Sequence, residues 1–251
     1  MTARRSENLL LIAAREPTPG FTKTRLGATL GMAAAATLYR AFLTDLAERF
    51  MPPALGEHPP FDLGWAFTPA TCDFPAVIGG LSPSLASAVA DGARRPRFVP
   101  QQGDDWGERQ ANLLRWGHDA GYRRTVLTAS DSPQMALATV TGAFAALDDH
   151  DVVLGRVHDG GYYLIGLSGP HDVLRDVPMS TASAADGLVA RAADLGLRLA
   201  EVEATFDVDV AGDLAALRAH ALLDPGAIPA TVAALARLST APGSEPVPAR
   251  R

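Results

Sequence analysis

The chain has 251 residues, 47% of them hydrophobic and 20% charged, a balance that excludes a disordered or fibrous protein and suits one α/β domain. The formal net charge of −6 argues against sequence-independent binding to DNA or RNA, so nucleic acid is not expected as a partner. Cys72 is the only cysteine, and no stretch approaches the roughly 20 apolar residues that span a bilayer, so we expect a soluble, cytoplasmic protein with no membrane partner.

Alternating apolar runs and helical patterns predict strands and helices in turn. The run 9–14 has no polar alternation, which predicts a central parallel strand covered on both faces. In 30–50, the apolar residues Leu38, Phe42, Leu46 and Phe50 recur every fourth position and predict the buried face of a helix.

The rest of the chain continues the same alternation. Further strands are predicted at 62–67, 97–99, 125–130, 151–157, 162–168 and 198–203, and further helices at 107–119, 138–149, 183–195 and from Asp213 onward. The Gly-, Ser- and Pro-containing segment before the third strand is expected to be irregular. Together these predict a mostly parallel sheet with helices on both faces. We expect one domain over 8–238, between a flexible N-terminus at 1–7 and a disordered tail at 239–251.

A cationic loop, 14–27, follows the first predicted strand. It contains Arg15, Lys23 and Arg25, together with Gly20, and it precedes a helix. Fixed cations, backbone N–H groups and a positive helix end provide the charge neutralisation and directed donors that a polyphosphate requires. The same composition also fits a basic turn that faces water. A P-loop is excluded, because the second glycine that precedes the lysine in that motif is missing.

Carboxylates follow two other predicted strands. Asp131 ends one strand and precedes Ser-Pro, so its side chain would project where ligands bind in such sheets, although a turn or helix cap is an alternative. Asp207 and Asp209 follow another strand, where an extended backbone would point both to one face, and a helix N-cap is the alternative. Oxygen ligands from two strand ends suit Mg²⁺ or Mn²⁺ bound jointly with substrate phosphates.

Two glycines connect the pair of strands around 151–168. Gly160 and Gly161 lack side chains, so a ligand or another backbone segment could approach closely, with Asp159 as a polar contact of that pocket. A plain hairpin is the alternative, since Asp-Gly is a common tight-turn dipeptide.

Five motifs, taken in order, resemble those of one bacterial family: AREPTPGFTKTRL, QQGDDWGER, SDSP, HDGGYYLIG and DVDVAGDL. They are similar to the glycosyltransferase-A-fold proteins known as DUF2064, a family of nucleotide-diphospho-sugar transferase type, over most of 8–217. More distantly, Lys23-Thr24-Arg25-Leu26 and Asp131-x-Pro133 resemble elements of phospholactate and molybdopterin guanylyltransferases. The resemblance implies a single glycosyltransferase-A-like, three-layer α/β domain with a mostly parallel central sheet.

The resemblance also implies roles for the candidate residues. Lys23 and Arg25 would hold nucleotide phosphates and, with Asp131, act in catalysis, while Asp131 and Asp209 would bind Mg²⁺ or Mn²⁺. The full set of candidate phosphate-binding residues is Arg15, Gly20, Lys23, Thr24 and Arg25. The candidate acceptor-binding residues are Asp159, Gly160, Gly161 and Tyr162.

Three functions fit this pattern. Nucleotidyl transfer from a nucleoside triphosphate to a small phosphate- or phosphonate-type acceptor is favoured, because the loop carries more positive charge than a nucleoside diphosphate sugar demands. Glycosyl transfer from a nucleotide-diphospho-sugar is the alternative, although Asp131-Ser132-Pro133 lacks the Asp-x-Asp pattern of many glycosyltransferases. The third is a noncatalytic nucleotide-binding module, which would be expected to have lost the metal carboxylates.

Overall fold

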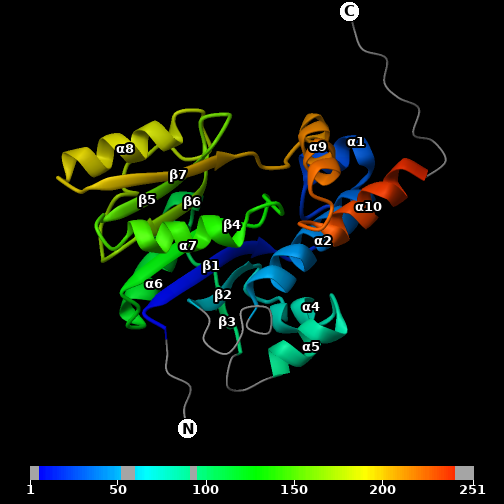
Figure 1. Cartoon of the computed structure of the whole chain (residues 1–251), viewed down its shortest axis with the longest axis horizontal. Helices are drawn as coiled ribbons and strands as arrows, with labels where there is room; N and C mark the ends of the chain where they lie inside the picture. Colours follow the sequence, from blue (N-terminus) through cyan, green and yellow to red (C-terminus); the bar gives the residue numbers. More distant parts are fainter. Residues whose placement is uncertain (1–5, 52–59, 91–94, 241–251) are drawn as a thin grey trace, which may run out of the picture.

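The computed structural model describes residues 6–51, 60–90 and 95–240. A seven-stranded sheet in the order β3-β2-β1-β4-β6-β5-β7 forms its centre (Figure 1). β6 is antiparallel to both of its neighbours, and the remaining pairs are parallel, which confirms the predicted mostly parallel sheet. The strands are β1 (Asn8–Arg15), β2 (Asp62–Thr68), β3 (Arg97–Pro100), β4 (Arg124–Ala129), β5 (Val152–Val157), β6 (Tyr162–Leu167) and β7 (Leu199–Thr205).

Helices cover both faces of this sheet. They are α1 (Thr24–Leu30), α2 (Met32–Phe50), α4 (Phe74–Gly79), α5 (Pro83–Ala90), α6 (Trp106–Asp119), α7 (Leu137–Ala146), α8 (Ala184–Asp194), α9 (Leu214–Leu223) and α10 (Pro229–Thr240), with a short 3₁₀ helix, η1 (Ala211–Asp213). One apolar cluster joins the sheet to α2, α4, α7 and α10, and a second joins its other face to α6 and α8. In Figure 1, α2 and α10 lie side by side, and the two helices are in direct contact.

The central strand β1 shows why a continuous apolar run forms here. Leu10 and Ile12 belong to one apolar cluster, whereas Leu9 and Leu11 belong to the other. Successive side chains of a strand point to opposite faces, so a strand with helices on both sides is apolar at every position. The predicted doubly covered, central parallel strand is confirmed.

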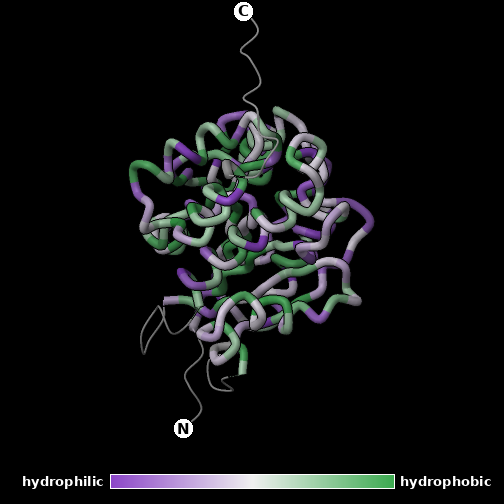
Figure 2. Tube along the Cα trace, turned by 90° about the vertical axis from the view of Figure 1, so that its right-hand side faces the viewer, coloured by the Kyte–Doolittle hydropathy of each residue, from purple (hydrophilic) through white to green (hydrophobic). Residues whose placement is uncertain are grey.

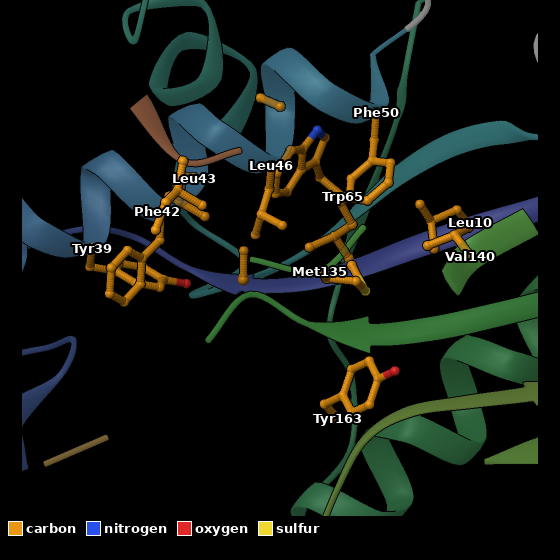
Figure 3. Close-up of a cluster of buried hydrophobic side chains, with 14 of the residues drawn as sticks. Leu10, Tyr39, Phe42, Leu43, Leu46, Phe50, Trp65, Met135, Val140 and Tyr163 are labelled. Carbon is orange, nitrogen blue, oxygen red and sulfur yellow. The ribbon is translucent and has the colours of Figure 1, made fainter. Parts of the chain in front are cut away.

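Helix α2 buries the face that its sequence predicts. Leu38, Phe42, Leu46 and Phe50 are all fully buried. Figure 3 shows Phe42, Leu43 and Leu46 pointing from α2 toward the strands. Hydrophobic and hydrophilic residues alternate along the helical turns in Figure 2, the pattern of helices with one buried and one exposed face.

The segment expected to be irregular before β3 instead contains α4 and α5. Asp73 caps α4 by accepting a hydrogen bond from the Ala76 N–H at 3.2 Å, and two side chains of the helix, Phe74 and Ile78, are buried in the core. The N-cap and the burial of Phe74 and Ile78 outweigh the weak helix propensity of the glycine, serine and proline residues in this segment.

Helix α10 continues to Thr240, past the predicted start of the tail at 239. Residues 1–5 and 241–251, where flexible ends are predicted, lie outside the described residues. Across 6–51, 60–90 and 95–240, no helix combines the length and apolar character needed to cross a membrane.

Candidate functional site

A cleft of about 730 Å³ lies at the carboxyl ends of the parallel strands. Ligands of open α/β sheets bind at this edge, where the loops after the strands meet. The cleft gathers the cationic loop after β1, the end of β4, the β5–β6 connection, the segment after β7 and the start of α6. Predicted site residues that line it are Arg15, Lys23, Thr24, Arg25, Asp131, Asp159, Gly161, Tyr162 and Asp209.

Lys23 joins the two carboxylates that the sequence predicts as metal ligands. Its Nζ lies 2.6 Å from Asp131 Oδ1 and 3.0 Å from Asp209 Oδ1, and its side chain is only 5% exposed. Burial by itself would lower the pKa of Lys23, but the charges of Asp131 and Asp209 outweigh that effect and raise the pKa. Lys23 is therefore an ammonium ion held between two carboxylates.

Asp209 is fixed from two sides. Arg25 Nη2 lies 2.5 Å from Asp209 Oδ2, on a side chain that is 71% exposed. Burial opposes ionisation of Asp209, yet Lys23 and Arg25 lower its pKa and keep it a carboxylate. Behind it, Asp213 Oδ2 accepts hydrogen bonds from the backbone N–H groups of Asp209 and Val210 at 2.7 and 2.8 Å. The acidic cap of this turn is thus Asp213, and the Asp209 side chain faces the cleft, where it pairs with Lys23 and Arg25.

Direct hydrogen bonds hold the loop after β4 against the segment after β7. The Val208 N–H donates to the Asp131 carbonyl at 3.0 Å, and the buried Ser132 hydroxyl donates to the Phe206 carbonyl at 3.0 Å. Two segments far apart in sequence are therefore joined at the point where Asp131 and Asp209 meet. This contact gives a structural role to Ser132, the second serine of the Ser-Asp-Ser-Pro motif.

Asp207 lines the same cleft but has a different environment from Asp209. It is half-buried, and no hydrogen bond to Lys23 forms. Burial and the nearby charge of Asp209 raise the pKa of Asp207 to about 6. Of the two aspartates that the sequence places on one face, only Asp209 shares Lys23 with Asp131.

The Asp-Gly-Gly segment forms the turn of a β5–β6 hairpin and also shapes the cleft. Asp159 Oδ1 accepts a hydrogen bond from the Gly161 N–H at 3.0 Å. Gly160 has φ +92°, and a Cβ on it would lie 1.9 Å from the Ala182 carbonyl oxygen. Gly160 is not among the residues that line the cleft. Because it has no side chain, the backbone near Ala182 can pack against it, and Ala182 does line the cleft.

Tyr162 reaches the cleft from the start of β6. Its hydroxyl accepts a hydrogen bond from Gln110 Nε2 at 2.7 Å and lies 3.2 Å from Met179 Sδ. Burial raises the pKa of Tyr162, so the group is a neutral phenol. Gln110 was not singled out in the sequence, because only the folded chain brings α6 to β6.

Tyr39, which no sequence pattern singles out, holds the cationic loop in place. The Tyr39 hydroxyl accepts the Arg15 N–H at 3.0 Å and lies 2.7 Å from Ser130 Oγ. It thereby ties the loop to the strand end that carries Asp131. Gly20 has φ +79° with open space around it and lies outside the cleft lining, so it serves the turn of the loop.

The QQGDDWGER motif, which had no assigned role, presents Arg109 at the cleft. Arg109 Nε donates to the Gly103 carbonyl at 2.9 Å, and Gly103 itself has φ +138° and packs against the Arg109 backbone. Asp105 caps α6 by accepting the Glu108 N–H at 2.8 Å. These contacts fix the start of α6, from which Trp106 also enters the cleft lining.

The donor set suits a metal shared with a substrate. In the described parts of the chain no group of three or more His, Cys, Asp or Glu side chains gathers as a metal site. Asp131 and Asp209 nevertheless converge on one point, marked by Lys23 Nζ. Mg²⁺ is commonly bound through one or two protein carboxylates plus substrate phosphates, so these two residues fit such an ion.

Comparison with known proteins agrees with the fold. Residues 76–181 match the model of a family described as an uncharacterized protein conserved in bacteria, DUF2064. The predicted family resemblance is confirmed. A proposed nucleotide-diphospho-sugar transferase from Desulfovibrio desulfuricans G20 is 29% identical, with a TM-score of 0.75 over 93% of this chain and 97% of its own. The predicted three-layer, glycosyltransferase-A-like fold is confirmed with it.

Two further solved structures are more distant. A nucleotidyl transferase from Methanothermobacter thermautotroptrophicus is 18% identical, with a TM-score of 0.48 over 86% of this chain and 97% of its own. A 4-diphosphocytidyl-2C-methyl-D-erythritol synthase is 11% identical, with a TM-score of 0.49 over 86% of this chain and 97% of its own. No curated protein sequence matches the chain.

Proposed function

We propose that this protein is a metal-dependent nucleotidyltransferase, which joins a nucleoside monophosphate from a nucleoside triphosphate to a small phosphate- or phosphonate-type acceptor and releases pyrophosphate. One observation carries the proposal: Lys23 contacts both Asp131 and Asp209, and Arg25 contacts Asp209, all within 3.0 Å at the strand ends. Phosphoryl chemistry depends mostly on positioning and charge stabilisation, and this arrangement joins cations for phosphates to carboxylates for a metal.

The cationic loop would hold the triphosphate. Arg15, Lys23 and Arg25 reach the cleft from one loop, so several phosphate groups could be neutralised side by side. As the bond between the α-phosphorus and the bridging oxygen breaks, negative charge develops on the departing pyrophosphate. Lys23 and Arg25 would stabilise that charge.

The two carboxylates would hold Mg²⁺ or Mn²⁺. When bound, the ion would supply charge stabilisation at the phosphate oxygens. Asp131 and Asp209 are suited to this because Ser132 and Asp213 fix their backbones on adjacent segments.

The acceptor would approach from the side of Asp159, Gly161 and Tyr162. Its oxyanion attacks the α-phosphorus, a new phosphorus–oxygen bond forms, and pyrophosphate leaves from the opposite side. An acceptor that is already an anion requires neither a protein nucleophile nor a strong general base. The neutral phenol of Tyr162, whose O–H donates to Met179 Sδ at 3.2 Å in the structure, could redirect that hydrogen bond to the acceptor.

The test is a turnover assay with Mg²⁺, each of the common nucleoside triphosphates and a panel of phosphorylated and phosphonylated acids, with pyrophosphate release as the readout. The proposal predicts acceptor-dependent release of pyrophosphate. Release of nucleoside diphosphate from sugar nucleotides, with no pyrophosphate from any triphosphate, would overturn it.

Glycosyl transfer from a nucleotide-diphospho-sugar is the second candidate. It is favoured by the similarity to the Desulfovibrio protein, which is itself a proposed nucleotide-diphospho-sugar transferase. In that reaction the same metal and cations would stabilise a departing nucleoside diphosphate. We favour nucleotidyl transfer because the loop offers three positive charges, whereas the two phosphates of a nucleotide-diphospho-sugar need only two for neutralisation.

A single cysteine suits the reducing cytoplasm, where we propose that the protein acts.

A further inference from the structure

Lys23 contacts one oxygen of each of the two carboxylates that would bind a divalent metal ion. Its Nζ lies 2.6 Å from Asp131 Oδ1 and 3.0 Å from Asp209 Oδ1. An ammonium group and a divalent cation cannot both lie between two carboxylates at these distances, because their charges repel strongly in a partly buried site. The two cations therefore compete for one pair of ligands.

We propose that Lys23 makes metal binding depend on the nucleotide: it blocks the ligands Asp131 and Asp209 until phosphates give its ammonium group another anionic partner. This inference rests on the metal site of the proposed function. It assigns Lys23 a second role, the control of when the metal binds, in addition to its contact with phosphate.

Burial makes Lys23 suited to this role. Its side chain is only 5% exposed, so its ammonium group has little contact with water and depends on the two carboxylates as partners. Its backbone holds φ +49° at the start of α1, and its Nζ lies 5.9 Å from the centre of the Tyr39 ring. Only a new anion inside the cleft can replace the two carboxylates, and nucleotide phosphates are anions of that kind.

Arg25 offers a matched comparison. It also pairs with Asp209, at 2.5 Å, but through the other carboxylate oxygen and from a side chain that is 71% exposed. No ion pair joins Arg25 to Asp131. Loss of Arg25 removes the same unit of charge without clearing the point between the two carboxylates.

The experiment measures Mn²⁺ binding to the full chain without nucleotide, from the electron paramagnetic resonance signal of free Mn²⁺. Lys23→Met removes the charge and keeps most of the side-chain length. It should tighten Mn²⁺ binding by at least about tenfold relative to wild type, whereas Arg25→Met should tighten it by about threefold or less. Lys23→Gln should behave as Lys23→Met does, which guards against a folding defect of one variant.

Equal tightening in the Lys23 and Arg25 variants would overturn the inference, because it would reflect net charge alone. No tightening in either Lys23 variant, with unfolding transitions like that of wild type, would also overturn it. Adding Asp131→Asn to Lys23→Met separates this inference from the proposed function. If the double variant loses the tight site, the metal ligands stand; if it keeps the site, the proposed metal site itself is wrong.

Discussion

Replacement of Asp131 by asparagine should separate catalysis from stability. The change preserves shape but removes one of the two carboxylate charges that would hold the metal. Loss of a metal ligand charge is expected to lower turnover at least about a thousandfold, a barrier increase of about 4 kcal/mol. Turnover is measured as pyrophosphate release. If the variant kept turnover within tenfold of wild type, Asp131 would not be a metal ligand in catalysis.

The cost in folding should be much smaller. Asp131 is 35% exposed, and its partner Lys23 keeps a second carboxylate, Asp209, at 3.0 Å. The asparagine oxygen can still accept a hydrogen bond from Lys23. We therefore expect the free energy of unfolding to fall by about 1–2 kcal/mol, the difference between a charged and a neutral hydrogen bond. Urea unfolding followed by circular dichroism measures it.

Asp148→Asn is the matched control. Asp148 pairs with Arg124, a cation that is only 10% exposed, at the opposite end of β4 from Asp131. The same substitution there should cost a comparable amount of stability and leave turnover unchanged. If both variants lost turnover equally, the effect of Asp131→Asn would come from strand stability and not from metal binding.

Three further predictions concern residues around the cleft. Tyr39→Phe should weaken triphosphate binding by about tenfold in calorimetry, the value of about one hydrogen bond, because the Arg15 N–H loses its acceptor; unchanged affinity would contradict this role. Gly160→Ala should lower the free energy of unfolding by more than about 1 kcal/mol, since φ is +92° and the new Cβ would meet the Ala182 carbonyl; a neutral result would count against the close approach. The pKa of Asp207 is raised from its ordinary 3.8 to about 6 by burial and neighbouring carboxylates, so the folded state holds this proton more tightly than the unfolded state. Wild-type stability, relative to Asp207→Asn, should therefore fall as the pH rises from about 4 to 6, and a constant difference would contradict the assignment.

Local patterns in the sequence predicted the elements that carry the site. The apolar run of β1 is covered on both faces, and the fourth-residue repeat of α2 is buried, because both patterns report burial directly. Asp131 and Asp209 come after β4 and β7, whose carboxyl ends lie at one edge of the sheet. The general rule for ligand sites in such sheets was therefore enough to predict their proximity.

The contacts between these elements could not be predicted in the same way. Lys23 between two carboxylates, and Tyr39 between Arg15 and Ser130, depend on how distant segments pack. The helices α4 and α5 could not be predicted because their segment contains several glycine, serine and proline residues, which are weak helix formers, while buried Phe74 and Ile78 stabilise α4 through tertiary packing.

Following the α-phosphate of the nucleotide tests the central claim most directly. The protein would be incubated with Mg²⁺, the acceptor panel and a triphosphate labelled either at the α- or at the γ-phosphate, and in parallel with Mg²⁺, the acceptor panel and sugar nucleotides. Nucleotidyl transfer predicts that the α label enters the acceptor product and that the γ label leaves in pyrophosphate. Absence of α label from every acceptor, together with nucleoside diphosphate release from a sugar nucleotide, would contradict the account and establish glycosyl transfer in its place.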